Sequence, residues 1–409
     1  MKILVQKFGG TSVSTQERRD MVADKIEKAL KNGFFPVVVV SAIGRNGDPY
    51  ATDTLIKLGN SIGVKSSPRE MDLLISCGEI ISCVMLANTI KKGKHDSKAL
   101  TGGQAGIITD ENFGDAEVIN VDPQNIYDSI KKNVIPVIAG FQGKSEKGEI
   151  TTLGRGGSDV TAAIIAEALN AEAIEIYTDV EGIMTADPSI VPNATVMDTI
   201  YYNEVFQMAE YGSKVIHPRA VEVAMRSSIP LIIKNTLTDS AGTLITNCDK
   251  NRKYRHDKNN KILTAIAQVS GRVRARIVFD GSAGEYENDK HLFSIIASEG
   301  ISIDMINVNP DFKLFIIEDS NKEKLEKVLE RHGYNYELKP DCSKVTIIGN
   351  KMRGIPGVMA KAISALASKN IEVLQTSDSH TTISCLIESS YTNEAVNALH
   401  QEFGLGNIG

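Results

Sequence analysis

The 409-residue sequence has few cysteines, no long apolar run and no excess of positive charge. Its five cysteines include no C-x-x-C pair, which argues against a disulfide framework and a zinc site and favours free thiols in a reducing cytoplasm. The longest continuous apolar run, at 34–40, is far shorter than the roughly 20 residues that span a bilayer, and the first residues lack a signal-peptide core. The formal net charge of −6 argues against nucleic-acid or membrane partners held by bulk charge. We therefore expect a soluble, cytoplasmic protein.

The first part of the chain, to about residue 245, alternates short β-branched runs with segments of helical length. The runs are continuously apolar, which is typical of strands buried on both faces of a parallel sheet. They lie at 37–41, 134–139, 173–178 and 230–234, and the helical patterns lie at 16–32, 68–92, 159–169 and 215–227. This order predicts an α/β sandwich with a mainly parallel sheet.

A short strand at 3–5 leads into KFGGTSV, which has the features of a phosphate-binding turn. Gly9 and Gly10 have no Cβ, so backbone N–H groups can approach an anion closely, and Lys7 adds a positive charge. The spacing differs from G-x-x-x-x-G-K-[ST], which excludes a Walker-type loop. Because any tight turn after a strand can use glycine, the turn alone leaves phosphate binding and a structural role equally open.

Three further clusters carry chemically informative residues. In TTLGRGGSD, Arg155 stands at a helix entrance, where a positive charge opposes the helix dipole unless an anion joins it, while Ser158 or Asp159 could be an ordinary cap. In ISCGE, the residues alone favour a solvated helical carboxylate at Glu79. The segment YTDVEGIMTADP is either an ordinary turn or a ligand loop, since open α/β sheets bind ligands at the carboxyl ends of their strands.

The second part of the chain contains an internal repeat. It follows a polar, charged segment, CDKNRKYRHDKNNK, whose composition is typical of a linker. The stretch SIIASEGISI from Ser294 matches SALASKNIEV from Ser364, an offset of 70 residues. Each copy has the order strand, helix, strand, strand, helix, which predicts a ferredoxin-like module. The expected helices lie at 290–298 and 356–368, with second helices from about 321 and 392.

The chain resembles the aspartate kinases of the amino-acid-kinase superfamily in six motifs followed by paired repeats. The motifs are, in order, KFGGTSV, SAIGRNGDPYATD, SCGE, TTLGRGGSD, TDVEGIMTADP and YGSKVIHPRAVE. The resemblance covers essentially the whole chain and is greatest to the monofunctional bacterial isozyme that diaminopimelate inhibits. The repeats resemble the ACT domains of that family. The implied domains are a catalytic domain at 1–245, a linker at 246–261 and ACT domains at 262–341 and 342–409.

The resemblance implies transfer of the γ-phosphoryl group of ATP, bound with Mg²⁺, to the side-chain carboxylate of L-aspartate. The product, 4-phospho-L-aspartate, begins the pathway to lysine, threonine, methionine and diaminopimelate. The resemblance assigns catalysis to Lys7, Asp159 and Lys214. The implied ATP-binding positions are Lys7, Phe8, Gly9, Gly10, Ser12, Thr178, Asp179, Met184, Thr185, Asp187, Pro188, Ser213 and Lys214. The sequence contains no dedicated cage of metal ligands.

Aspartate carries both signs of charge, and the resemblance supplies both to its site. Arg155 matches the family arginine that clamps a carboxylate, and Glu79 matches the glutamate near the substrate ammonium. Asp159 could orient either that ammonium or the catalytic lysine. The other implied substrate positions are Thr52, Gly156, Gly157 and Ser158.

The two repeats differ at the loop after the first strand. The first copy reads FDGSAGEYENDK where many relatives carry a Pro-Gly loop, whereas the second keeps MRGIPGV. We therefore expect a feedback effector, either lysine, threonine or meso-diaminopimelate, to depend chiefly on the second copy. The candidate positions are Gly354, Gly357, Ser377 and Asp378. Paired ACT domains imply a homo-oligomer, a dimer or larger, and the alternative is that the repeats serve only to dimerise the enzyme.

Two other functions would leave different sequences. A superfamily kinase for glutamate, acetylglutamate or UMP would keep the nucleotide loop but lose the combination of KFGGTS, GRGGSD and paired ACT units. A catalytically dead amino-acid sensor would lose the charged site residues. Lys7, Glu79, Arg155 and Asp159 are all present, so neither alternative is favoured.

Overall fold

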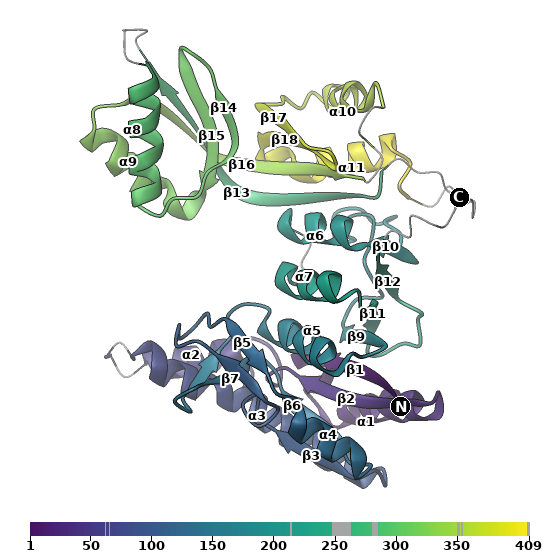
Figure 1. Ribbon diagram of the computed structural model, residues 1–409. Coiled ribbons are helices and arrows are strands. Elements are labelled where there is room, and N and C mark those ends of the chain that lie inside the picture. Colours follow the sequence, from purple (N-terminus) through teal and green to yellow (C-terminus); the bar gives the residue numbers. More distant parts are fainter. Residues whose placement is uncertain are drawn as a thin grey trace. The chain divides into compact units, whose positions relative to one another are not determined.

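The computed structural model describes residues 1–61, 63–64, 66–212, 215–247, 263–279, 285–349, 352 and 355–406. The chain divides into two compact units (Figure 1). The first unit holds Met1–Ile183, Val196–Ala209 and Lys214–Tyr254, and the second holds Met184–Thr195, Glu210–Ser213 and Arg255–Gly409. Two short segments of the expected catalytic domain therefore pack with the second unit. The boundaries at 245 and 261 stay predictions, because the expected linker lies mostly outside the described residues.

The first unit is built on an eight-stranded sheet with the order β10-β12-β11-β9-β1-β2-β6-β3. Its strands are β1 (Lys2–Phe8), β2 (Phe34–Val40), β3 (Ser97–Leu100), β6 (Ile135–Ala139), β9 (Ala173–Thr178), β10 (Thr199–Tyr201), β11 (Leu231–Asn235) and β12 (Thr243–Thr246). Every neighbouring pair in this sheet is parallel except β11 with β12. The predicted α/β class and mainly parallel sheet are therefore confirmed.

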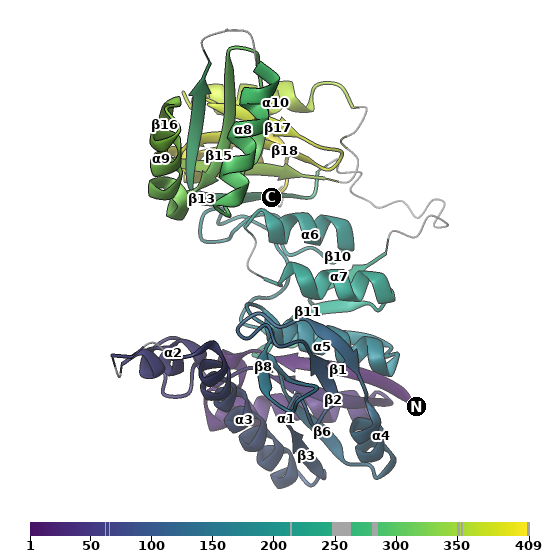
Figure 2. The ribbon, with the colours of Figure 1, turned by 60° about the vertical axis from the view of Figure 1, so that its left-hand side comes forward.

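Helices cover both faces of this sheet (Figure 2). They are α1 (Gln16–Lys31), α2 (Thr52–Asn60), α3 (Pro68–Lys92), α4 (Gln124–Lys131), α5 (Gly157–Leu169), α6 (Tyr202–Glu210) and α7 (Pro218–Ser227). Successive residues of a strand point to opposite faces, and on β1 Gln6 lines a cavity with residues of α1 while Lys7 pairs with a residue of α5. Hence α1 and α5 lie on opposite faces of the sheet.

Helix α3 begins with standard helix signals and has the predicted bounds, 68–92. Ser67 accepts a hydrogen bond from the backbone N–H of Glu70 at 3.3 Å, and Pro68 occupies the first turn. By length and composition alone this helix could cross a membrane, although it contains no continuous apolar run of that length. It is mostly buried inside the first unit, however, and its buried residues include Asp72 and Glu79. Among the described residues it is the one helix that passes this test, and its burial is typical of a core helix.

A second, four-stranded sheet was not predicted. It has the order β5-β4-β7-β8, with β4 (Ile107–Thr109), β5 (Val118–Val121), β7 (Gln142–Ser145) and β8 (Ile150–Thr152). Asp72 of α3 joins it to the helix layer, because its carboxylate accepts hydrogen bonds from the backbone N–H of Thr152 at 2.8 Å and of Gly114 at 3.0 Å. Burial raises the pKa of Asp72 above its ordinary value, and these hydrogen bonds partly offset that effect.

The second unit contains a six-stranded sheet with the order β14-β15-β13-β16-β18-β17. The strands are β13 (Ala265–Val278), β14 (Asp304–Val308), β15 (Phe312–Glu318), β16 (Asn335–Ile348), β17 (Gln375–Asp378) and β18 (Thr382–Glu388), and the main helices are α8 (Glu285–Ser298), α9 (Lys322–Arg331), α10 (Val358–Ala367) and α11 (Thr392–Glu402). The 70-residue offset relates β15 to β18 and the start of α9 to the start of α11 residue for residue. The predicted repeat is thus confirmed.

The two repeats share the long strands β13 and β16. We define module A as residues 272–341 and module B as residues 342–406 with 265–269. The second half of β13 pairs with β15, and the second half of β16 pairs with β18, while β13 and β16 pair along both halves. Module B therefore takes its fourth strand from the chain that precedes module A. The register shifts after Val269, where β13 passes from one module to the other.

Module B also incorporates part of the segment 184–195. Ala186 and Val191 belong to the same apolar core as Leu366 and Leu399. The backbone N–H of Ile266 donates to the carbonyl oxygen of Thr185 at 2.8 Å. The loop in which the sequence predicts adenosine contacts is therefore built into the core of module B.

Candidate active site

The glycine turn after β1 is closely packed. The backbone N–H of Gly9 donates to the carbonyl oxygen of Tyr177 at 3.1 Å, and the N–H of Gly44 donates to the carbonyl oxygen of Gly10 at 3.0 Å. A Cβ on Gly10 would clash with the carbonyl oxygen of Ala42 and lie 2.6 Å from that of Gly44. Glycine is required there because two strand-end loops meet backbone to backbone.

Lys7 and Asp159 meet beside this turn. The Lys7 Nζ lies 2.7 Å from the Asp159 Oδ1, and both side chains are largely buried. Asp159 is in the first turn of α5, which Gly156 introduces with φ 71°. A Cβ on Gly157 would lie 2.8 Å from the ring of Phe141, so α5 begins close against its neighbours. Two of the three predicted catalytic residues are brought together, and the third, Lys214, lies outside the described residues.

Glu79 of α3 is buried, with 2% of its surface exposed. Its Oε1 accepts a hydrogen bond from the backbone N–H of Ala42 at 3.1 Å, whereas its Oε2 has no hydrogen-bond partner among the described residues. Burial raises the pKa of Glu79 to about 8. The reading as a solvated helical carboxylate is therefore wrong. An acceptor left open in a buried position points to a donor that arrives with a ligand.

The other expected aspartate-site residues lie at the starts of helices. Arg155 is exposed and has no hydrogen bond or ion pair to another described residue, so its guanidinium is available to a ligand. Ser158 lies within α5 and is half-buried. Thr52 is the first residue of α2 and is also half-buried.

A cavity of about 360 Å³ opens beside the glycine turn. Its lining residues come from the ends of β1, β2, β9 and β11, and they are Thr11, Ser12, Ser14, Thr15, Arg18, Gly44, Arg45, Asp48, Thr178, Asp179, Thr236 and Leu237. The Ser12 Oγ lies 2.6 Å from the Thr236 Oγ1. Arg45 forms an ion pair with Asp179. The predicted nucleotide residues Ser12, Thr178 and Asp179 therefore share one cavity.

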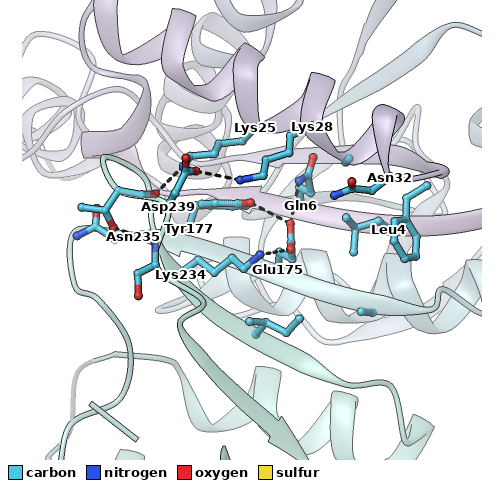
Figure 3. A pocket seen from close by; sticks show the side chains of 16 residues that line it. Leu4, Gln6, Lys25, Lys28, Asn32, Glu175, Tyr177, Lys234, Asn235 and Asp239 are labelled. Carbon is cyan, nitrogen blue, oxygen red and sulfur yellow. Dashed lines mark hydrogen bonds and ion pairs between the residues drawn. The ribbon is translucent and has the colours of Figure 1, made fainter. Parts of the chain in front are cut away.

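A second cavity of about 190 Å³ lies on the α1 face of the same strands (Figure 3). Here the Glu175 carboxylate accepts hydrogen bonds from Gln6 at 2.9 Å, Tyr177 at 3.0 Å and Lys234 at 2.6 Å. Burial, followed by the Glu175 charge, raises the pKa of Tyr177. Lys25 and Lys28 are paired with Asp239 at its rim. This network ties β1, β9 and β11 together on the face away from Lys7.

The remaining predicted positions lie in the second unit or outside the described residues. Thr185 is buried, and its Oγ1 lies 2.9 Å from the His400 Nε2. Asp187 accepts hydrogen bonds from the backbone and hydroxyl of Ser189, and Met184 and Pro188 belong to the same segment. Gly357 precedes α10 with φ 93°, whereas Ser377 and Asp378 are exposed on β17. Ser213 and Gly354 lie outside the described residues.

Sequence reasoning missed Thr236, Arg45 and Asp48 as cavity residues. Thr236 directly follows β11, so the rule that ligands bind at the carboxyl ends of parallel strands pointed to it. Arg45 and Asp48 stand in the SAIGRNGDPYATD motif, from which the resemblance assigned only Thr52 to the site. Within the described ranges, no group of three or more His, Cys, Asp or Glu side chains is arranged to hold a metal ion.

Comparison with known proteins identifies the family. Residues 2–235 match the model of the amino acid kinase family, and residues 337–401 match an ACT domain model. Aspartokinase 1 of Bacillus subtilis is 41% identical over 405 residues, covering 99% of this chain and all of the relative. The structure of Escherichia coli aspartokinase III with aspartate and ADP shares the fold, with a TM-score of 0.80, 24% identity, and 98% and 99% coverage of the two chains. The same enzyme with lysine and aspartate gives a TM-score of 0.73 at 25% identity, covering 98% of this chain and 100% of that one. The chain therefore belongs to the amino acid kinase family and, within it, to the aspartokinases.

Proposed function

We propose that this chain transfers the γ-phosphoryl group of ATP to the side-chain carboxylate of L-aspartate and forms 4-phospho-L-aspartate. The observation that carries the proposal is the position of the Lys7–Asp159 pair beside the glycine turn. The loop that packs on this turn also donates through Ala42 to the buried Glu79, whose Oε2 has no described hydrogen-bond partner. A phosphate-binding turn and an amino-acid site share that loop, as a kinase for an amino acid requires.

The acceptor needs no general base. A model aspartate side chain has a pKa of about 3.9, so it is ionised at neutral pH. Catalysis then consists of aligning two anions and stabilising the charge on the moving phosphoryl group. Lys7 is suited to this task, because Asp159 fixes its ammonium 2.7 Å away while a partly exposed surface leaves room for a phosphate oxygen.

Glu79 and Arg155 supply opposite charges for the α-ammonium and α-carboxylate of aspartate. The ammonium would donate to the open Oε2 of Glu79 and favour its ionised form, reversing the effect of burial on its pKa. The guanidinium of Arg155 can hold a carboxylate through two parallel hydrogen bonds. Thr52, Gly156, Gly157 and Ser158 complete the predicted substrate site.

The nucleotide would occupy the 360 Å³ cavity, which Ser12, Thr178 and Asp179 line. The family resemblance assigns Phe8, Gly9 and Gly10 to the phosphates, and Met184, Thr185, Asp187, Pro188, Ser213 and Lys214 to the remainder of the ATP site. Mg²⁺ is usually held by one or two protein carboxylates and the substrate phosphates. Asp48 and Asp179 both line the cavity and are carboxylates of this kind. Bound there, Mg²⁺ would offset charge on the phosphates.

Feedback control would act through the ACT modules. The 25% identical Escherichia coli aspartokinase III binds lysine together with aspartate in its structure. For this chain, lysine, threonine and meso-diaminopimelate are the candidate effectors, with Gly354, Gly357, Ser377 and Asp378 as candidate contacts. We infer a cytoplasmic homo-oligomer, consistent with the four described cysteines being free.

The direct test is ATP-dependent acyl phosphate formation, trapped with hydroxylamine. L-Aspartate should give the hydroxamate, whereas glutamate and acetylglutamate should give none above background. UMP, whose phosphorylation forms no acyl phosphate, is tested by ADP release and should cause none above background. Suppression of turnover by lysine, threonine or meso-diaminopimelate would identify the effector. Turnover that none of them alters would leave the modules with a role only in assembly. Product with glutamate and none with aspartate would refute the proposed substrate.

A further inference from the structure

The loop at 42–51, between β2 and α2, is fixed to the glycine turn at its base. The backbone N–H of Gly44 donates to the carbonyl oxygen of Gly10 at 3.0 Å. The next residue, Arg45, begins a tight turn in which its N–H donates to the Asp48 Oδ2 at 2.7 Å. The backbone of Arg45 is therefore held in place relative to the predicted phosphate site, and only its long side chain is free to move.

Arg45 and Asp179 both line the 360 Å³ cavity. The Arg45 side chain is 66% exposed, and its guanidinium pairs with the carboxylate of Asp179, which follows β9. Because β1 lies between β9 and β2 in the sheet, this ion pair passes above the turn at the end of β1. An exposed ion pair contributes little to stability, so its opening costs little.

The predicted phosphate site has few other cations in the described part of the chain. The ammonium of Lys7 is already shared with Asp159. Arg18, the other arginine lining the cavity, donates from Nη1 to the carbonyl oxygen of Thr11 at 2.7 Å. A guanidinium that now faces a carboxylate can present the same pair of donors to phosphate oxygens.

We propose that Arg45 binds the γ-phosphate of ATP and releases Asp179 as the nucleotide enters the cavity. The inference rests on the proposed kinase function. The order of the strands indicates which phosphate Arg45 meets. The predicted adenosine contacts Thr178 and Asp179 lie at the end of β9, on one side of β1. The loop after β2, on the other side, donates through Ala42 to Glu79 of the predicted aspartate site. The group to be transferred must lie between these two sites, where the Arg45 side chain passes.

The test compares nucleotides that differ in the γ-phosphate. In the full-length Arg45→Met variant, affinity for the non-hydrolysable analogue AMP-PNP with Mg²⁺ should fall at least about tenfold. Affinity for ADP should change less than about twofold, because the charge-assisted contact is lost only at the γ-phosphate. The AMP-PNP affinity of Arg45→Lys should lie between those of wild type and Arg45→Met, since an ammonium keeps the charge but not the two parallel donors of the guanidinium. Arg69→Met is the matched control, because Arg69 also forms an exposed ion pair, with Glu149, away from the cavity.

Equal losses for AMP-PNP and ADP, or no loss for either, would overturn the proposal. These binding data remain decisive even if wild-type protein phosphorylates no aspartate, a result that would refute only the kinase function.

Discussion

The carboxyl edge of the central sheet and its α1 face use the same strands for different purposes. On the α1 face, the Glu175 carboxylate accepts hydrogen bonds from Gln6, Tyr177 and Lys234, and one buried acceptor, the Oε1 of Gln6, has no partner among the described residues. At the carboxyl edge, Glu79 keeps an open oxygen and Arg155 has no described ion pair. Charged groups paired with one another hold strands together, whereas charged groups without a described partner at the carboxyl edge indicate a site that a ligand completes.

The largest effect should come from removing the charge at the glycine turn. Lys7→Ala should lower kcat by about 10³-fold or more, because the lost group stabilises charge that develops on the phosphoryl oxygens. Stability should fall as well, because the largely buried Asp159 carboxylate loses its ion-pair partner, so the loss of kcat in the folded protein is the result that distinguishes this site. Steady-state kinetics and thermal melts on the same preparation check both points. A variant that loses stability but keeps kcat would assign Lys7 to the scaffold.

On the α1 face we expect a loss of stability without a loss of kcat. Glu175→Ala should lower the free energy of unfolding by about 3 kcal/mol, because it leaves Lys234 and two polar groups without their shared acceptor. The folded fraction should keep a kcat close to that of wild type. Urea unfolding and an active-site titration measure these quantities. A large fall in kcat at unchanged stability would erase the distinction between the two regions.

A smaller and more selective effect is expected at Arg155, just before the N-terminus of α5. Arg155→Lys should raise KM for aspartate by about 10-fold to 100-fold, because a lysine cannot form two parallel hydrogen bonds to a carboxylate. KM for ATP should stay within about twofold of the wild-type value. Initial rates with each substrate varied in turn decide the matter. Equal increases in both constants would remove Arg155 from the amino-acid site.

The smallest effect is a pH dependence from Glu79, whose pKa is raised to about 8. If the ionised form binds the ammonium, kcat/KM for aspartate should rise with pH and level off above about 8, and Glu79→Gln should flatten the profile. Stability should run the other way: the folded state holds a proton that the unfolded state loses near 4.5, so the contribution of Glu79 is present below that pH and is lost as the pH rises through 8. A profile unchanged in Glu79→Gln would exclude it as the titrating group.

The central sheet and its main helices were predictable because each depends on a local pattern. The runs at 37–41 and 173–178 have the composition of doubly buried strands and became β2 and β9. The four-stranded sheet was missed, because strands as short as β4 and β8 carry too few residues for a pattern. The sharing of β13 and β16 between modules A and B was also missed, because the pairing of these strands joins residues that no sequence periodicity relates.

The site was predictable in residue identity but not in environment. Motif resemblance selected Lys7, Asp159 and Glu79, and the first two indeed meet. The burial of Glu79 could not be read from its helix, because the loop after β2, distant in sequence, covers it and supplies the Ala42 N–H. Likewise the Arg45–Asp179 pair joins loops 134 residues apart.

The most direct test of the account is to count protons when aspartate binds. Isothermal titration of the full-length protein with L-aspartate, in the presence of Mg·ADP at pH 7 and in two buffers of different ionisation enthalpy, gives the number released. With a pKa of about 8 in the free site, Glu79 should release most of a proton as it meets the ammonium, and Glu79→Gln should release almost none. Equal release from both proteins, or none from wild type, would contradict the claim that the open carboxylate is completed by the substrate.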